Sequence, residues 1–151
     1  MGNAAGVFAL LATLALGLTA GALLAEAAVL IPWWRTLPAD AFLAWYAANT
    51  SRLFQFFGTL EMVSAVLVIA AAAVVRGRWF VAAALLSIAV LALFPLYFQR
   101  VNASFESATI ASAELPAVLA RYAAWHWLRT IIGIAAFTAA AVGLRARDRS
   151  G

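Results

Sequence analysis

Residues 6–31 read GVFALLATLALGLTAGALLAEAAVLI, an apolar run whose single ionisable residue is Glu26. A helix rises about 1.5 Å per residue, so a run of this length can cross the roughly 30 Å hydrocarbon core of a bilayer. The next four residues, 32–35, read PWWR, and tryptophans beside an arginine are typical of the membrane interface. The pattern predicts a transmembrane helix that ends at Ile31.

Three further apolar runs are long enough to span a bilayer, at residues 53–75, 79–98 and 117–144. Residues 76–78, two arginines around a glycine, leave room only for a tight turn, so the second and third helices are predicted to form an antiparallel hairpin. Pro116 suits the first turn of the fourth helix. The predicted fold is all-α: an integral membrane four-helix bundle with antiparallel, up-down-up-down topology.

The segment between the first two helices departs from the apolar pattern. Residues 33–52 mix aromatic side chains with Pro38, Asp40 and other polar residues. Within this segment, residues 39–46 are predicted to form a short amphipathic helix on the membrane surface. We therefore expect a structured extracytoplasmic loop here.

Composition favours a membrane protein and excludes several classes. Of 151 residues, 67% are hydrophobic and 11% charged, which leaves too little polar surface for a soluble globule. The absence of cysteine excludes disulfides and thiolate metal ligands, and the absence of lysine excludes a Schiff base. The net charge of +4 comes from arginines at helix ends and in short loops, so we expect membrane lipid and no nucleic acid as partner.

The distribution of arginines predicts the orientation. Two lie in the turn at residues 76–78 and three lie in the C-terminal tail, at Arg145, Arg147 and Arg149, whereas no lysine or arginine precedes Arg35. Cytoplasmic segments are enriched in these residues. Both termini are therefore predicted to be cytoplasmic, and the first helix is predicted to belong to the mature protein rather than to a signal peptide. The alanine- and arginine-rich composition suggests a bacterial plasma membrane.

Three ionisable residues inside the apolar helices are the candidate functional residues: Glu26, Glu61 and the only histidine, His126. An ionisable side chain at the centre of a membrane helix costs at least about 2.5–3.5 kcal/mol, which is why such residues usually serve a function. In the predicted topology they lie in the outer half of the bundle with Arg129, which shares a helix face with His126. The cytoplasmic halves contain almost no polar residue, which favours a pocket open to the outer side.

Structural roles for these residues stay open. His126 stands between two tryptophans, as in an interfacial aromatic belt. A buried Glu61 needs a partner, and an ion pair with Arg129 or Arg52 would provide one. Glu26 has no partner within four residues, so its partner must come from another helix.

We expect no cofactor, with a bound metal as the alternative. Glu26, Glu61 and His126 together offer the ligand types that iron, zinc or manganese prefer. However, no Glu-x-x-His or His-x-x-x-His spacing occurs, whereas bundled di-iron sites use two Glu-x-x-His motifs. For a haem, the sequence offers a single histidine, His126, as axial ligand.

Scattered residues between Gly17 and Thr130 form a pattern. They are Gly21, Glu26, Pro32-Trp33-Trp34, Asn49, Phe56-Phe57-Gly58-x-x-Glu61, Pro95, Asn102 and Trp125-His126-x-x-Arg129-Thr130. This pattern resembles the small four-helix membrane proteins that include the fungal anthrone oxygenases, although Tyr97 stands where that family has an asparagine. The resemblance implies a four-helix bundle that oxidises a lipophilic, aromatic small molecule with molecular oxygen and no known cofactor.

The resemblance and the residue chemistry together predict roles at the site. His126 is the predicted base that makes an electron-rich carbanion, and Glu26 or Glu61 is expected to orient its ring. Arg129 or Arg100 is expected to hold the resulting oxyanion. The predicted substrate-binding residues are Trp33, Asn49, Phe56, Phe57, Arg100, Asn102, Trp125 and Trp127.

Two other functional classes stay open. One is a non-catalytic accessory or lipid-binding subunit, and the other is a small proton- or ion-coupled transporter that uses Glu26 and Glu61. A transporter of four helices needs at least a dimer, and the spacing Gly17-x-x-x-Gly21 permits close approach of a helix from a second copy or from the same bundle. Direct Glu–Arg pairs without a cavity favour the structural role, and an enclosed, aromatic-lined outer pocket that contains Glu26, Glu61 and His126 favours an enzyme.

Overall fold

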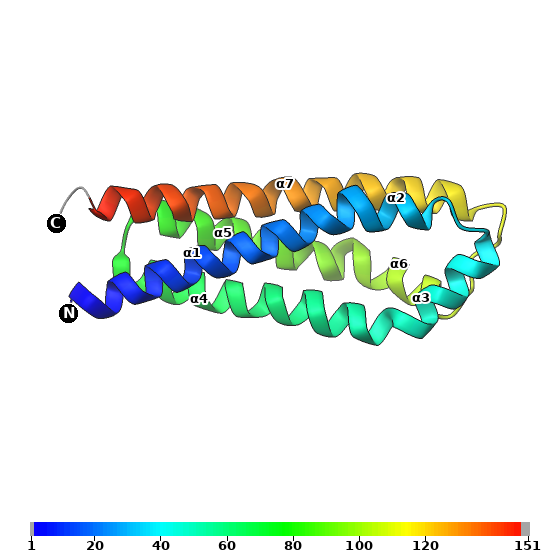
Figure 1. The fold of residues 1–151 in the computed structure, drawn as a ribbon, viewed down its shortest axis with the longest axis horizontal. Coiled ribbons are helices and arrows are strands. Elements are labelled where there is room, and N and C mark those ends of the chain that lie inside the picture. The colour runs from blue at the N-terminus through cyan, green and yellow to red at the C-terminus, as the bar shows by residue number, and fades with distance from the viewer. Residues whose placement is uncertain (1, 149–151) are drawn as a thin grey trace.

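The computed structural model describes residues 2–148, and the helical segments within them join into four long helices (Figure 1). The first long helix comprises α1 (Gly2–Ala25), η1 (Glu26–Leu30) and α2 (Ile31–Trp34), and the second comprises α3 (Ala39–Leu53), η2 (Phe54–Gly58) and α4 (Thr59–Val75). The third comprises α5 (Arg78–Leu93), η3 (Phe94–Phe98) and α6 (Gln99–Glu106), and the fourth is α7 (Leu115–Asp148). The segments η1, η2 and η3 are π-helical turns.

All four long helices are long and apolar enough to cross a membrane. Figure 1 shows that they alternate in direction and that both ends of the chain lie at the same end of the molecule. α1 packs against α4 and α7, and α5 packs against the same two helices, which closes a four-membered ring. Of the predicted arginine tail, Arg149 lies outside the described residues.

The first long helix continues to Trp34 instead of ending at Ile31. Pro32 lacks the N–H that a regular α-helix needs, and it lies in the first turn of α2, directly after the π-helical turn η1. Within that turn the Ile31 N–H donates to the carbonyl of Glu26, five residues back. The wider turn lets the helix continue past the proline.

The second long helix begins at Ala39, fourteen residues before the expected start at Leu53. The expected loop over residues 33–52 is therefore mostly helix, and residues 39–46 form the first part of a long helix instead of a separate surface helix. Pro38 precedes the helix with an extended backbone, φ −55° and ψ 149°.

The amphipathic pattern of α3 has a different cause from the one expected. Phe42 and Tyr46 are buried, and both rings contact the buried ring of Trp34, with centroids 5.7 Å apart in each pair. The apolar face of α3 therefore packs on the other helices rather than on lipid headgroups.

The third and fourth long helices also exceed their expected bounds. The third continues past Pro95 and Phe98 to Glu106, because the Gln99 N–H donates five residues back, to the carbonyl of Phe94, across another π-helical turn. The fourth begins at Leu115, and Pro116 occupies its first turn as expected.

Two hydrophobic cores hold the two ends of the helices. The core near the chain termini, here called the alanine core, consists of Ala9, Ala12, Leu16, Val68, Ala71, Phe80, Ala83, Ala84, Ala136, Ala139 and Ala140. The core at the opposite end, here called the aromatic core, consists of Ile31, Trp34, Phe42, Leu43, Tyr46, Leu93, Phe98, Phe105, Leu115, Leu119 and Tyr122. Small side chains in the alanine core bring the helices close together, which favours van der Waals packing in lipid.

The two glycines of the Gly17-x-x-x-Gly21 spacing lie in different surroundings. A Cβ on Gly17 would lie 3.1 Å from the Phe137 ring of α7, whereas a Cβ on Gly21 would meet nothing within 4 Å. Gly17 therefore serves close packing of α1 on α7 within the bundle.

Gly143 lies where the helices approach closely at the alanine-core end, and its replacement tests the packing of the alanine core. A Cβ there would lie 3.0 Å from the Phe80 ring and 3.0 Å from Cβ of Trp79. We expect Gly143→Ala to lower stability by about 1–3 kcal/mol through overpacking, measured as thermal unfolding in detergent. Gly21→Ala is the matched control and should unfold at or above the temperature of the wild type. Equal melting temperatures for the two variants would contradict the packing.

Candidate functional site

A large cleft, with a volume of about 1070 Å³, separates the second and third long helices over part of their length. Most of its lining comes from residues between positions 46 and 63 of the second helix and between positions 91 and 106 of the third. The other two helices contribute Glu26, Tyr122 and Arg129, which form its back wall.

The cleft is open at its rim and closed at its back. Phe54 and Met62 at the rim are 62% and 55% exposed, whereas the three back-wall residues are buried. The Phe54 ring faces Phe94 of the third helix, with centroids 5.9 Å apart. These two rings contact each other across the opening between the second and third helices.

All three π-helical turns contribute residues to the cleft. Glu26 comes from η1, Phe57 and Gly58 come from η2, and Phe94 and Pro95 come from η3. A π-turn adds one residue to an α-helix and so rotates everything that follows by about 100°. Residues on both sides of each bulge can therefore face the same cavity, and such turns are frequent at functional sites.

Glu61 and Arg129 form a buried ion pair at the back of the cleft. Nη2 of Arg129 donates to both Oε1 and Oε2 of Glu61 at 2.5 Å. The guanidinium carbon lies 4.9 Å from the centre of the Phe98 ring, an arrangement that favours a cation. The ion pair that would explain Glu61 structurally is thus present, between α4 and α7.

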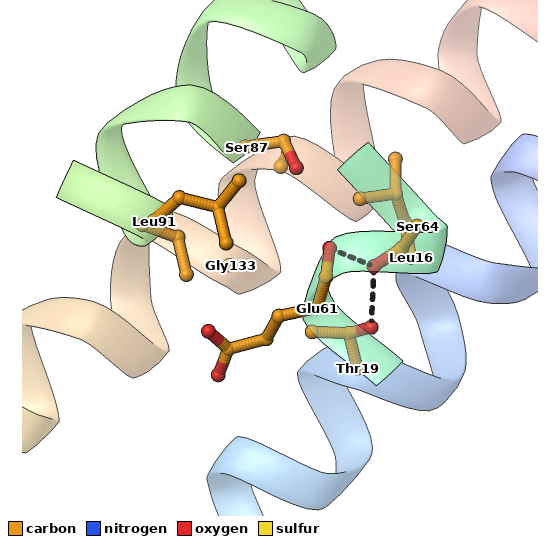
Figure 2. A pocket seen from close by; sticks show the side chains of 9 residues that line it. Leu16, Thr19, Glu61, Ser64, Ser87, Leu91 and Gly133 are labelled. Carbon is orange, nitrogen blue, oxygen red and sulfur yellow. Dashed lines mark hydrogen bonds between the residues drawn. The ribbon is translucent and has the colours of Figure 1, made fainter. Parts of the chain in front are cut away.

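Figure 2 shows that the Glu61 side chain extends away from a small hydroxyl network. Thr19 Oγ1 of α1 lies 2.8 Å from Ser64 Oγ, and the Ser64 hydroxyl contacts the carbonyls of Leu60 at 2.7 Å and Glu61 at 3.1 Å. The void beside these groups measures about 10 Å³, room for roughly one water molecule. The network ties α1 to the turn of α4 that carries Glu61.

Glu26 faces the cleft and has an indirect connection to α7. Its Oε2 lies 3.7 Å from Nε2 of His126, which is beyond hydrogen-bonding distance. The same Nε2 lies 3.1 Å from the Leu23 carbonyl, an acceptor, so Nε2 carries the proton. Thr130 Oγ1 also lies 3.3 Å from this carbonyl. Two α7 side chains therefore hold the backbone of the first helix one turn before Glu26.

His126 lies behind the cleft rather than in it. Its side chain is fully buried, and the ring of Tyr122, which lines the cleft, stacks on it at 6.3 Å with an angle of 6° between the planes. The Phe98 ring meets it edge-on at 6.0 Å. Nδ1 has no hydrogen-bond partner among the described residues. The arrangement makes Glu26 the group that reaches a cleft ligand, with His126 as its neighbour.

The cleft brings together some of the predicted site residues. Glu26, Phe57, Glu61, Asn102 and Arg129 line it. The remaining predicted residues are not among its lining: Trp33, Asn49, Phe56, Arg100, Trp125, His126 and Trp127. Most of these are exposed on the surface of the bundle, whereas the Asn49 amide donates to the Trp45 carbonyl at 2.8 Å.

Two tyrosines of the cleft were missed by the sequence interpretation. Tyr122 lies four residues before His126, a spacing that places both on one helix face and was available as a signal. Tyr46 was assigned to a surface helix, so no pattern placed it at the site. Both side chains are buried and line the cleft.

The metal alternative needs three ligands at one point. Within residues 2–148, no group of three or more His, Cys, Asp or Glu side chains is placed to hold a metal ion. Both oxygens of Glu61 are engaged by Arg129 instead.

No protein-family model, curated protein or solved structure matches this chain.

Proposed function

We propose that this chain is a membrane-embedded oxygenase that binds a lipophilic aromatic molecule in the cleft and oxidises it with molecular oxygen. The observation that carries the proposal is the position of Glu26, a buried carboxylate without a hydrogen-bonded partner among the described side chains, on the wall of a cavity of about 1070 Å³. Pockets for small molecules are concave, largely apolar and fitted with a few polar groups, and this cleft matches that description.

The proposed reaction converts a CH₂ group beside aromatic rings into a ketone, as the resemblance to anthrone oxygenases implies. Glu26 takes one proton from the CH₂ group, and the carbanion gives its electron pair to O₂ with formation of a carbon–oxygen bond. The resulting peroxide is protonated. Loss of the second C–H proton then forms the C=O bond, breaks the O–O bond and releases hydroxide, which becomes water. One O₂ is consumed, and one ketone and one water are formed.

The other back-wall groups suit this chemistry. The carbanion of a hydroxylated aromatic ketone carries much of its charge on oxygen, which hydrogen-bond donors stabilise. The hydroxyls of Tyr46 and Tyr122 are among the donors at the cleft wall, and Arg129, although bound to Glu61, keeps an Nε–H without a partner among the described residues. His126, whose Nε2–H donates to the Leu23 carbonyl, holds the turn of the first helix that precedes Glu26 and so positions this carboxylate.

The orientation proposed from the sequence suits a substrate that enters from the outer leaflet. The turn that holds Arg76 and Arg78, and the C-terminal end of α7 with Arg145, lie at the end of the molecule where both termini lie (Figure 1). We place that end in the cytoplasm. The cleft then belongs to the half of the bundle nearer the outer side.

Oxygen uptake tests the proposal. Purified protein in lipid nanodiscs should consume one O₂ per molecule of anthrone converted to anthraquinone, at a rate above that of empty nanodiscs. The Met62→Trp variant, which places an indole at the cleft rim, should lose this activity, and Val66→Trp, one turn away and outside the lining, should keep it. Equal rates with and without protein for anthrone and related hydroxylated aromatics would refute an oxygenase.

A lipid-binding bundle without catalysis is the second candidate. The observation that favours it is the Glu61–Arg129 pair, in which the two opposite charges balance each other without a ligand. In that case the cleft binds its ligand without oxygen uptake, which the same nanodisc preparation distinguishes.

A further inference from the structure

We infer that the cleft selects one class of ligand: an uncharged aromatic head that bears a hydroxyl group, with a single hydrocarbon tail that stays in the bilayer. The inference deepens the proposed function, because the aromatic nature of the head is taken from that proposal. It is carried by the shape of the cleft, by the distribution of charge along it and by the direction in which it opens.

The shape of the cleft is elongated. The lining of the second helix runs from Tyr46 to Val63, which corresponds to about 25 Å along the helix axis. A compact ring system occupies only part of such a length. A molecule with a head and a tail fits it better than a compact one.

Polarity changes along the cleft. Near one end the lining includes Thr50, Ser51, Asn102 and Glu106, whereas at the other end Val63 and Leu91 lie near the Glu61–Arg129 pair, whose two groups are bound to each other. The buried Oδ1 of Asn102 has no hydrogen-bond partner among the described residues. A buried polar atom without a partner costs free energy, and a ligand hydroxyl can supply the missing donor. The end that holds Asn102 therefore fits the head of an amphiphile, and the exposed apolar rim fits its hydrocarbon tail.

The charges of the lining disfavour an anionic head. Of the described residues that line the cleft, Glu26, Glu61 and Glu106 are acidic and Arg129 is the cation. The Arg129 guanidinium is already bound to Glu61, so no free cation faces a phosphate or carboxylate. Carboxylates accept hydrogen bonds and repel anions. The head that these groups complement is a hydrogen-bond donor, and an uncharged hydroxyl donates without bringing another charge into the membrane interior.

The opening faces outward between two neighbouring helices. Phe54, Met62 and Val63 at the rim are 62%, 55% and 48% exposed, and the second and third long helices are both apolar enough to span a membrane. The rim of the cleft then faces lipid, not water. A tail can remain among the lipid chains while the head reaches Glu26, which requires no transfer of the tail into water.

Photolabelling in nanodiscs of phosphatidylcholine tests this inference. The probe is a 4-alkylphenol with a diazirine in its alkyl chain, and the labelled residues are found by mass spectrometry. Label is expected on cleft residues such as Met62 and Phe94. Met62→Trp should reduce this labelling at least fivefold, whereas Val66→Trp, equally exposed but outside the cleft, should label like the wild type.

Competition identifies the head group. With amounts expressed as mole fraction of lipid, 4-dodecylphenol should block labelling at a concentration about tenfold below that of 4-dodecylanisole, which lacks the donor. Dodecyl phosphate should not compete. Equal competition by the phosphate, or labelling confined to the outer faces of the helices, would overturn the inference.

The proposed oxygenase and this inference fail separately. Cleft labelling without oxygen uptake supports the ligand class and refutes the oxygenase. Turnover of anthrone with no labelling of the cleft by the alkylphenol refutes the ligand class and leaves the oxygenase standing.

Discussion

Arg129→Gln is expected to lower the free energy of unfolding by about 3–5 kcal/mol, because it leaves the carboxylate of Glu61 buried without its partner. Glu61 is 4% exposed, and in the described structure both of its oxygens accept from Arg129. The substitution removes the charge of the guanidinium while keeping a polar side chain at the site. Reversible unfolding in bicelles measures the change.

The double variant Glu61→Gln/Arg129→Gln separates the loss of the pair from the loss of one partner. It removes both charges, so we expect it to recover at least half of the stability that Arg129→Gln loses. Arg100→Gln replaces an exposed arginine outside the cleft and serves as the control, with stability equal to the wild type. A double variant less stable than Arg129→Gln would show that the pair is not the source of the effect.

Glu26→Gln is expected to lower the turnover of anthrone by a factor of about 10²–10⁴, the usual contribution of a general base. The amide keeps the size of the side chain but cannot accept the substrate proton. Because Glu26 has no hydrogen bond to lose among the described side chains, thermal stability should stay equal to the wild type or rise. Oxygen uptake and thermal unfolding of the same nanodisc preparation give both quantities.

Two companion variants define the roles further. His126→Gln should lower turnover less than Glu26→Gln does, because His126 acts through Glu26 rather than on the substrate. Glu114→Gln, at an exposed position outside the cleft, is the control and should turn over like the wild type. Full activity of Glu26→Gln together with loss of activity in His126→Gln would return the role of base to the histidine.

The four apolar helices could be predicted from the sequence, but their ends could not. Length and hydropathy are properties of each run alone, so the spans near residues 6–31 and 117–144 follow directly from them. The ends depend on tertiary contacts. α3 has polar residues that read as a loop, and it is helical because Phe42 and Tyr46 bury their rings against Trp34.

The buried ionisable residues of the candidate site could be predicted more easily than the other residues that line the cleft. Buried charge costs free energy in any apolar helix, so Glu26, Glu61 and Arg129 stand out before the fold is known. The faces that side chains present are harder to predict, because each π-helical turn rotates the residues after it and breaks the 3.6-residue period. Phe57, within η2, lines the cleft, whereas the adjacent Phe56 is 59% exposed.

The division of the hydrophobic interior into an alanine core and an aromatic core has a consequence for how such a protein can change over evolutionary time. Both cores consist of buried side chains, whereas the rim of the cleft is lined by exposed ones. Substitutions at the rim leave both ends intact, so they carry a small cost in stability. One scaffold can thus acquire new ligands by mutation of the rim alone, while selection for folding acts on the ends.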